Sequence, residues 1–417
     1  MRKLNLLIQQ FNAGRISRRQ FIVRASALGL SLPLIGGILA ACETTDDDDD
    51  DVAVTDDTAE PTPTVPGEVT ATPAPENGVT GQITWVSPRG TLEVLDDYAY
   101  WVAESYGWFG DIETIMEPGP MEATSTARLV DQGQADVGFP SPGVYTLSLE
   151  AGVGVTSVYQ MGALDVFAFA FQPGSGIESL EDLVGREIAL GDPGWESIAN
   201  PLFAQAGIDP SEVNYVEAGE GWAQSLAQGQ ADAALTWEGL RAQWEGQGLE
   251  FDYLLGKDFS AFPANSFVIR TEEVDDEELR PLYEQYFRGW SMGLEFGYLN
   301  PRAATQHTMD QFPALAEQME PEIAVESMMQ LANCYRGDFD ARDGWGWHDP
   351  ESWEIFLETI AELGQVSEVF DTDVILSNDF IAAANDFDHD EVQQAADEFE
   401  LRPEYEEVDV EAIRARL

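Results

Sequence analysis

Two tryptophans and two oppositely charged side chains stand out as groups able to hold a small molecule. Trp195 and Trp237 offer large flat rings, while Glu238 and Arg89 offer a carboxylate and a guanidinium. Rings of this kind stack against a planar molecule, and charged groups fix its orientation through hydrogen bonds. The alternatives are ordinary core packing for the rings, because the chain contains 11 tryptophans, and a solvated carboxylate at a helix start for Glu238.

The residue types needed for covalent or metal chemistry form no known motif. The three histidines, His307, His348 and His389, lack metal-ligand spacing, and no nucleophile-elbow, phosphate-loop or dinucleotide fingerprint occurs. Cys334 belongs to no such motif either, and we interpret it as a buried structural cysteine. We therefore expect a binding protein with no catalytic residues, no metal and no cofactor.

Strand-like and helix-like segments alternate from residue 82 onward, which indicates an α/β architecture. The first strand is predicted at 83–87 and the helix after it at 92–106, and the pattern becomes mostly helical from about residue 275. In open α/β sheets a ligand lies beyond the carboxyl ends of the strands, where helix N-termini also point. That rule selects these candidate ligand contacts, to which we add the acidic Asp165: Ser87, Arg89, Ser141, Asp192, Trp195, Thr236, Trp237, Glu238 and Asn265.

The charge of this predicted site stays open. If Arg89 points inward, an anionic group is favoured through a charge-assisted pair. If it points outward, Glu238 with Asp165 and Asp192 makes the site acidic and favours a cationic heterocycle. Because aromatic and acidic residues outnumber basic ones at the selected positions, we favour an amine-bearing or aminopyrimidine-like solute over a sulfonate, taurine or nitrate type of anion.

Two segments far apart share one pattern. Residues 129–139 and 226–236 both have the order helix, Gly, X, Ala, Asp, strand, which predicts a left-handed glycine closing a helix before a buried strand. Between them, residues 179–190 read Ser-Leu-Glu-Asp-Leu-Val-Gly-Arg-Glu-Ile-Ala-Leu. Together with 205–213 and 365–386, this series resembles the extracytoplasmic solute-binding proteins of ABC importers, in particular the nitrate, sulfonate, taurine and thiamine-precursor group.

The resemblance implies an α/β fold with two lobes, of the periplasmic-binding-protein type II, in which a ligand is held between the lobes. It implies two crossing segments, near Phe171 and Asn265, and a helical C-terminal region packed on the first lobe. The expected ranges are 82–170 and 266–400 for the first lobe, 171–265 for the second lobe, and 401–417 for an acidic, loosely held tail.

The resemblance also implies a function. The chain is expected to capture a small organic solute and to deliver it to a membrane permease driven by a cytoplasmic ATPase. A sensor subunit of the same fold, or an enzyme built on it, are the alternatives.

The N-terminal residues resemble an export signal. Residues 17–22, Ser-Arg-Arg-Gln-Phe-Ile, are similar to a twin-arginine motif, and an apolar run leads to Leu39-Ala40-Ala41-Cys42, which is similar to a lipoprotein box. We expect cleavage before Cys42, lipid on Cys42, and a location on the extracytoplasmic face of the cell membrane. The alternative is a retained membrane helix, for which the run is short. Residues 43–81, rich in Asp, Thr and Pro, are predicted to be a disordered tether.

The chain is strongly acidic, with 77 Asp and Glu against 20 Lys and Arg. Such a charge repels nucleic acid and anionic lipid, so neither is an expected partner. An acidic, lysine-poor surface resembles those of proteins from high-salt habitats, where screening removes much of the self-repulsion. We expect a monomer whose partners are the solute, the permease with its ATPase, and the membrane through the lipid.

Overall fold

The computed structural model describes residues 78–120 and 122–417. The predicted signal, the lipid attachment at Cys42 and the tether up to residue 77 lie outside the described residues. Regular structure begins with β1 (Thr80–Val86), slightly before the expected start at residue 82. None of the helices in the described ranges is long and apolar enough to cross a membrane.

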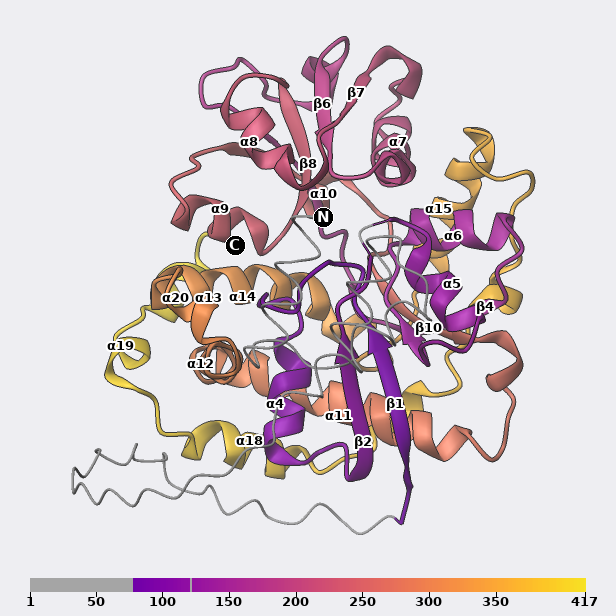
Figure 1. Ribbon diagram of the computed structural model, residues 1–417, viewed down its shortest axis with the longest axis vertical. Helices are drawn as coiled ribbons and strands as arrows, with labels where there is room; N and C mark the ends of the chain where they lie inside the picture. The colour runs from indigo at the N-terminus through magenta and orange to yellow at the C-terminus, as the bar shows by residue number, and fades with distance from the viewer. Residues whose placement is uncertain (1–77, 121) are drawn as a thin grey trace, which may run out of the picture. The chain divides into compact units, whose positions relative to one another are not determined.

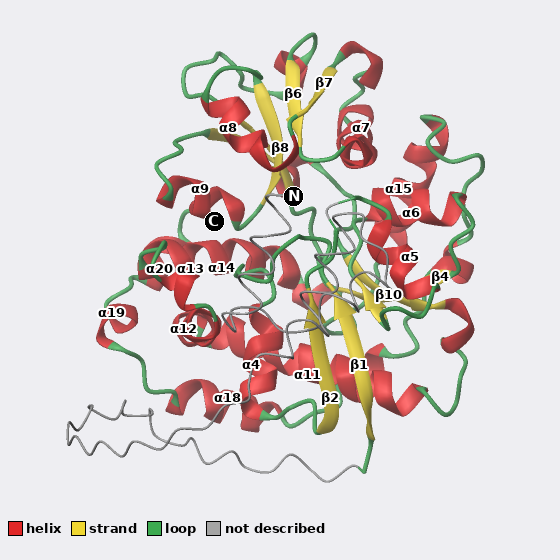
Figure 2. Ribbon diagram, viewed as in Figure 1, coloured by secondary structure: helices red, strands yellow, loops and turns green. Residues whose placement is uncertain are grey.

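Within residues 78–120 and 122–417, ten strands form two mixed five-stranded sheets, seen as two separate groups in Figure 2. The first sheet has the order β2-β1-β3-β10-β4, with β2 at Asp111–Glu117, β3 at Val137–Gly138, β10 at Ser266–Arg270 and β4 at Val155–Gln160. The second has the order β7-β6-β8-β5-β9, with β7 at Asn214–Glu217, β6 at Glu187–Leu190, β8 at Ala233–Trp237, β5 at Phe167–Phe171 and β9 at Asp252–Leu255. In each sheet one strand runs antiparallel to both its neighbours, β10 in the first and β5 in the second.

Helices surround both sheets, as Figure 1 shows. Those between the strands are α4 (Tyr98–Tyr106), α5 (Ser125–Asp131), α6 (Pro142–Glu150), α7 (Glu196–Gln205), α8 (Trp222–Ala227), α9 (Leu240–Gly246) and α10 (Gly256–Phe259). Those after β10 are α11 (Arg280–Leu299), α12 (Pro301–Gln311), α13 (Pro313–Ala316), α14 (Pro321–Arg336), α15 (Pro350–Glu362), α16 (Thr372–Ile375), α17 (Ile381–Ala384), α18 (His389–Glu398), α19 (Pro403–Glu406) and α20 (Val410–Arg414).

The second sheet has one bulky face and one small face because its strands alternate. In β5, Phe169 packs on Phe203 of α7 with ring centroids 5.0 Å apart. On the opposite face, Ala170 lies beside Ala234, and both belong to a small core with Trp244 of α9. The short alanine side chains leave room there for large rings.

The two similar segments have the same local structure in the two lobes, as predicted: a left-handed glycine ends a helix before a strand. Gly133 and Gly229 close their helices with φ of 66° and 67°, a left-handed conformation that favours glycine. The following Asp136 accepts a 2.8 Å hydrogen bond from the Thr84 N–H, and Asp232 accepts one of 3.0 Å from the Glu187 N–H. Each carboxylate therefore fixes the loop before a strand onto the neighbouring strand.

The first crossing segment lies earlier in the chain than the predicted position near Phe171. Phe171 pairs with Ala233 and Asp252, so all of β5 lies in the second sheet, and the first crossing is residues 161–166. The sequence of β5, in which Phe and Ala alternate, did not show which of the two sheets this strand joins. The return crossing, residues 260–265, leads into β10 beside the expected position of Asn265.

The C-terminal region packs on both lobes and not only on the first. The Ser327 hydroxyl of α14 donates a 2.8 Å hydrogen bond to the Gly239 carbonyl beside α9, and Phe356 of α15 contacts Phe262 with centroids 5.3 Å apart. The end of the chain also differs from the loose tail we expected. Tyr405 and Ile413 are buried, because the helical turns α19 and α20 place them against the core.

Candidate functional site

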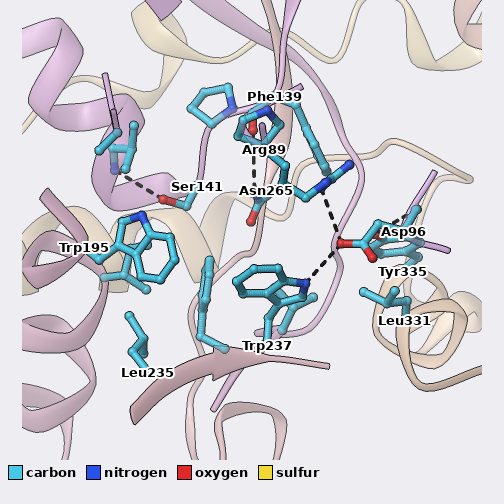
Figure 3. Close-up of a pocket in the computed structure, with 17 residues that line it drawn as sticks. Arg89, Asp96, Phe139, Ser141, Trp195, Leu235, Trp237, Asn265, Leu331 and Tyr335 are labelled. Atoms are coloured by element: carbon cyan, nitrogen blue, oxygen red, sulfur yellow. Dashed lines mark hydrogen bonds and ion pairs between the residues drawn. The ribbon is translucent and has the colours of Figure 1, made fainter. Parts of the chain in front are cut away.

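A cleft between the sheets brings together side chains from both lobes and from α14 (Figure 3). The space between these side chains, including its opening to solvent, is about 780 Å³. Its lining residues are Pro88, Arg89, Asp96, Ala123, Phe139, Pro140, Ser141, Val144, Val166, Phe167, Trp195, Ile198, Leu235, Trp237, Asn265, Leu331 and Tyr335.

Trp195 and Trp237 form aromatic walls of this cleft. Trp195 ends the 3-10 turn Pro193–Trp195 before α7, and Trp237 ends β8, and both side chains line the cleft. Their rings are T-shaped to each other, with centroids 6.1 Å apart and planes at 83°. The planes of the two rings are therefore nearly perpendicular.

Arg89 lines the cleft but is already paired with acidic side chains. Its guanidinium forms a close ion pair with Asp97, and its Nη1 lies 3.4 Å from Asp96 Oδ2. Burial works against the charged form, but the two carboxylates outweigh it and raise the pKa of Arg89 above its ordinary value. The positive charge is thus permanent and is balanced within the first lobe.

Asp96 is the carboxylate of this cleft, and it joins the two lobes. Its Oδ2 accepts a 3.1 Å hydrogen bond from Nε1 of Trp237, whereas its Oδ1 is buried without a hydrogen-bond partner. Burial raises the pKa of the Asp96 carboxyl to about 6, against the lowering effect of Arg89. A buried oxygen without a partner is costly, so this carboxylate is prepared to accept a hydrogen bond from a bound molecule.

Asn265 supplies a second free acceptor. Its amide nitrogen donates a 3.5 Å hydrogen bond to the Phe139 carbonyl, while its Oδ1 is buried with no partner. Figure 3 shows the Asn265 side chain between Phe139 and Trp237, on the wall of the cleft. Its place in the second crossing puts this acceptor between the two lobes.

The remaining predicted contacts at loop starts act mainly as caps. Ser141 lines the cleft and caps α6, its hydroxyl oxygen accepting a 3.4 Å hydrogen bond from the Val144 N–H. Ser87 is fully buried and accepts from the Arg89 N–H at 3.0 Å, and Asp192 accepts from the Gly194 N–H at 2.8 Å. Neither Ser87 nor Asp192 lines the cleft, because each side chain turns back onto its own loop.

Three predicted contacts lie behind the cleft and not in it. Thr236 is fully buried in β8, where its side chain points away from the cleft lining. Glu238 is 1% exposed and is held by Lys257 Nζ at 2.8 Å and by Arg241 at 3.0 Å, so the structure assigns it to an internal ion pair. Asp165 accepts a 2.9 Å hydrogen bond from the Phe167 N–H, and burial raises its pKa to about 7.

Sequence reasoning missed Asp96 and the α14 residues Leu331 and Tyr335. A helix was expected over 92–106, which places Asp96 inside a regular helix, but α4 begins only at Tyr98. The adjacent carboxylates Asp96 and Asp97, so near Arg89 in sequence, were the one available signal. No local pattern indicated that α14 contributes to the cleft. Its Tyr335 hydroxyl donates a 3.2 Å hydrogen bond to the Asp96 carbonyl.

The structure gives no support for nucleophilic chemistry at Cys334. The thiol is fully buried, and burial raises its pKa above its ordinary value. In the described ranges, no group of three or more His, Cys, Asp or Glu side chains is placed to hold a metal ion. At the start of α15, the Asp349 carboxylate caps the helix by accepting a 3.1 Å hydrogen bond from the Glu351 N–H.

A family model described as NMT1/THI5 like matches residues 97–304, so the chain carries an NMT1/THI5-like domain. No curated protein sequence matches the chain significantly.

Solved structures share the fold at low sequence identity. The alkanesulfonate-binding protein SsuA from Xanthomonas axonopodis pv. citri, bound to MOPS, has a TM-score of 0.53 at 11% identity, covering 73% of this chain and 97% of that one. The periplasmic sulfonate-binding protein SsuA from Methylobacillus flagellatus KT has a TM-score of 0.52 at 15% identity, over 73% and 93%. The ligand-binding component of an ABC-type import system from Staphylococcus aureus, with zinc bound, has a TM-score of 0.55 at 11% identity, over 73% and 99%. These likenesses confirm the predicted periplasmic-binding-protein fold.

Proposed function

From its NMT1/THI5-like domain on the periplasmic-binding-protein fold, we propose that this chain is the solute-binding subunit of an ABC importer. It captures a small organic molecule between its lobes and presents it to a membrane permease. The cleft supports this proposal, because its lining comes from both lobes and a solute bound there favours their closed arrangement.

The solute is a flat molecule with N–H groups, neutral or cationic, of the amine-bearing heterocycle class. The observation that carries this choice is the pair of buried acceptors, Asp96 Oδ1 and Asn265 Oδ1, that lack partners. Trp195 and Trp237 supply stacking surfaces beside them. Arg89 is the cation of the cleft lining, and its pairing with Asp96 and Asp97 leaves little positive charge for an anion.

A sulfonate-type anion is the second candidate. It is favoured by Ser141, since the N-terminal end of α6 that it caps also borders the cleft and helix N-termini attract anions. The names of the two SsuA structures point the same way. The two candidates differ in solute charge, since the first is neutral or cationic and the second is an anion, and this difference separates them.

The membrane anchor and the export route belong to the same proposal. The residues that support them are the twin arginines Arg18 and Arg19 and the lipoprotein-like Cys42. Labelling cells with a radioactive fatty acid should mark the chain, and the Cys42→Ala variant should lose the label. A label retained in that variant would reject lipid attachment at Cys42.

A thermal-shift assay of the purified chain in high salt tests the solute class. The probes are 4-aminopyrimidine, thiamine, taurine, methanesulfonate and nitrate. A specific solute at a hundred times its Kd stabilises the folded state by about 2.7 kcal/mol. A shift with 4-aminopyrimidine or thiamine supports the amine-bearing class. A shift with methanesulfonate or nitrate, with or without one from the zwitterion taurine, supports the anion, and no shift in a folded sample rejects both.

A further inference from the structure

Trp222 lies behind the aromatic walls of the cleft without lining it. It is the first residue of α8, and its ring stacks on Trp237 with centroids 6.1 Å apart and planes at 21°. The same ring is T-shaped to Trp195, with centroids 5.6 Å apart and planes at 87°. One side chain thus contacts both walls, which come from two other elements.

We propose that Trp222 is a positioning residue that holds the rings of Trp195 and Trp237 at their mutual angle and so determines the fit of a flat solute. This inference rests on the proposed function, since it concerns the same cleft. Trp222 Nε1 is buried and has no hydrogen-bond partner, so the residue acts through its ring surface and not through its N–H.

Trp195 is confined from its other side as well. A Cβ atom at Gly191 would lie 2.5 Å from Cη2 of Trp195, so glycine is needed for the ring to lie against the backbone. Between Gly191 and Trp222 the Trp195 ring has little freedom. A smaller side chain at 222 removes one of these two supports.

Trp237 transmits the effect to the other lobe. Its Nε1 reaches Asp96 Oδ2 at 3.1 Å only if the ring keeps its present orientation, and the face-to-face contact with Trp222 fixes that orientation. Loss of the Trp222 ring therefore disturbs a hydrogen bond between lobes in addition to the stacking surface. The Asp96 carboxylate is part of the proposed solute contact, so selectivity and lobe contact change together.

The test uses the full chain with Trp222→Phe and Trp222→Leu. The control is Trp345→Leu, because Trp345, like Trp222, has a buried Nε1 without a hydrogen-bond partner but packs away from the cleft, on Phe339. Two readouts are taken: the indole N–H resonance of Trp237, assigned with a Trp237→Phe variant, in the solute-free protein, and the calorimetric Kd for 4-aminopyrimidine.

Trp222→Phe should keep the Trp237 resonance and bind nearly as the wild type, because phenylalanine retains an aromatic face. Trp222→Leu should shift that resonance and bind roughly tenfold more weakly, because the two unsupported rings must be ordered when the solute binds. An unmoved Trp237 resonance in Trp222→Leu overturns the inference, as does an equal loss of affinity in Trp222→Leu and Trp345→Leu. If the wild type binds no 4-aminopyrimidine, the proposed solute class fails separately, and the Trp237 resonance alone decides the positioning role.

Discussion

Replacing Asp96 by asparagine should weaken solute binding and yet stabilise the solute-free protein at alkaline pH. The side chain is 4% exposed, and burial raises its pKa to about 6 from an ordinary 3.8. The folded chain therefore holds this proton more tightly than the unfolded chain. The resulting stabilisation is complete below pH 3.8 and is lost as the pH rises through 6.

The size of this effect follows from linkage. With the two pKa values above, the carboxyl contributes about 1.4 kcal/mol to the free energy of unfolding at pH 5 and about 0 at pH 8. Asparagine does not titrate, so the stability of Asp96→Asn relative to the wild type should rise by about 1.4 kcal/mol between these pH values. Arg89 keeps its close partner Asp97 in the variant, so no unpaired cation is created.

Affinity should change in the opposite direction. A hydrogen bond to a charged group contributes about 1.5 to 3 kcal/mol, so the Kd for an amine-bearing solute at pH 8 should rise about 10- to 100-fold. Urea unfolding at pH 5 and pH 8 and isothermal titration calorimetry measure the two effects. Asp192→Asn is the control, because Asp192 caps its own turn outside the cleft lining. A stability difference that does not vary with pH, or an unchanged Kd, would refute the reasoning.

Three further predictions concern a buried histidine, a close approach between the lobes and a buried ion pair. Burial lowers the pKa of His348 to about 4 from 6.5, so the stability that the neutral imidazole contributes above pH 6.5 is lost on acidification. Between pH 7 and pH 4.5, urea titrations should show that His348→Gln loses about 2 kcal/mol less unfolding free energy than the wild type. An unchanged acid sensitivity contradicts this. A Cβ in Gly143→Ala would lie 2.2 Å from the Ser197 carbonyl oxygen across the lobes, so the lobes should approach each other less closely. Calorimetry should then give a weaker Kd, and an unaltered Kd refutes the close approach. Lys257→Met removes one of the two cations that pair with the buried Glu238, and it should lower the unfolding free energy by about 3 kcal/mol. A second substitution, Glu238→Gln, should restore most of this stability. If the effects of the two substitutions simply add in a double-mutant cycle, the ion pair does not contribute.

Local sequence determined the parts of this fold that depend on neighbours in the chain. The glycine turns at Gly133 and Gly229 and the aspartates after them follow from backbone conformation and short-range hydrogen bonds, and both were predicted. Trp195 and Trp237 were found by the strand-end rule, because parallel strands bring their carboxyl ends to one edge.

Tertiary structure decided the electrostatics of the cleft. Whether Arg89 is free or neutralised depends on where α4 begins, and its start at Tyr98 leaves Asp96 and Asp97 in the preceding loop, next to the guanidinium. Local periodicity could not show this, because helix starts depend on packing as well as on sequence.

The partners of the other charged and helical residues were equally non-local. Glu238 forms an ion pair with Lys257 behind the cleft, and α14 brings Tyr335 to Asp96 from a distant part of the chain. The sequence by itself thus determined the architecture and the edge at which a solute is expected. The charge and the free hydrogen-bond acceptors of the site were decided only by the packing of distant elements. The reason is that the ionisation and pairing of a buried group depend on which other side chains lie next to it in space.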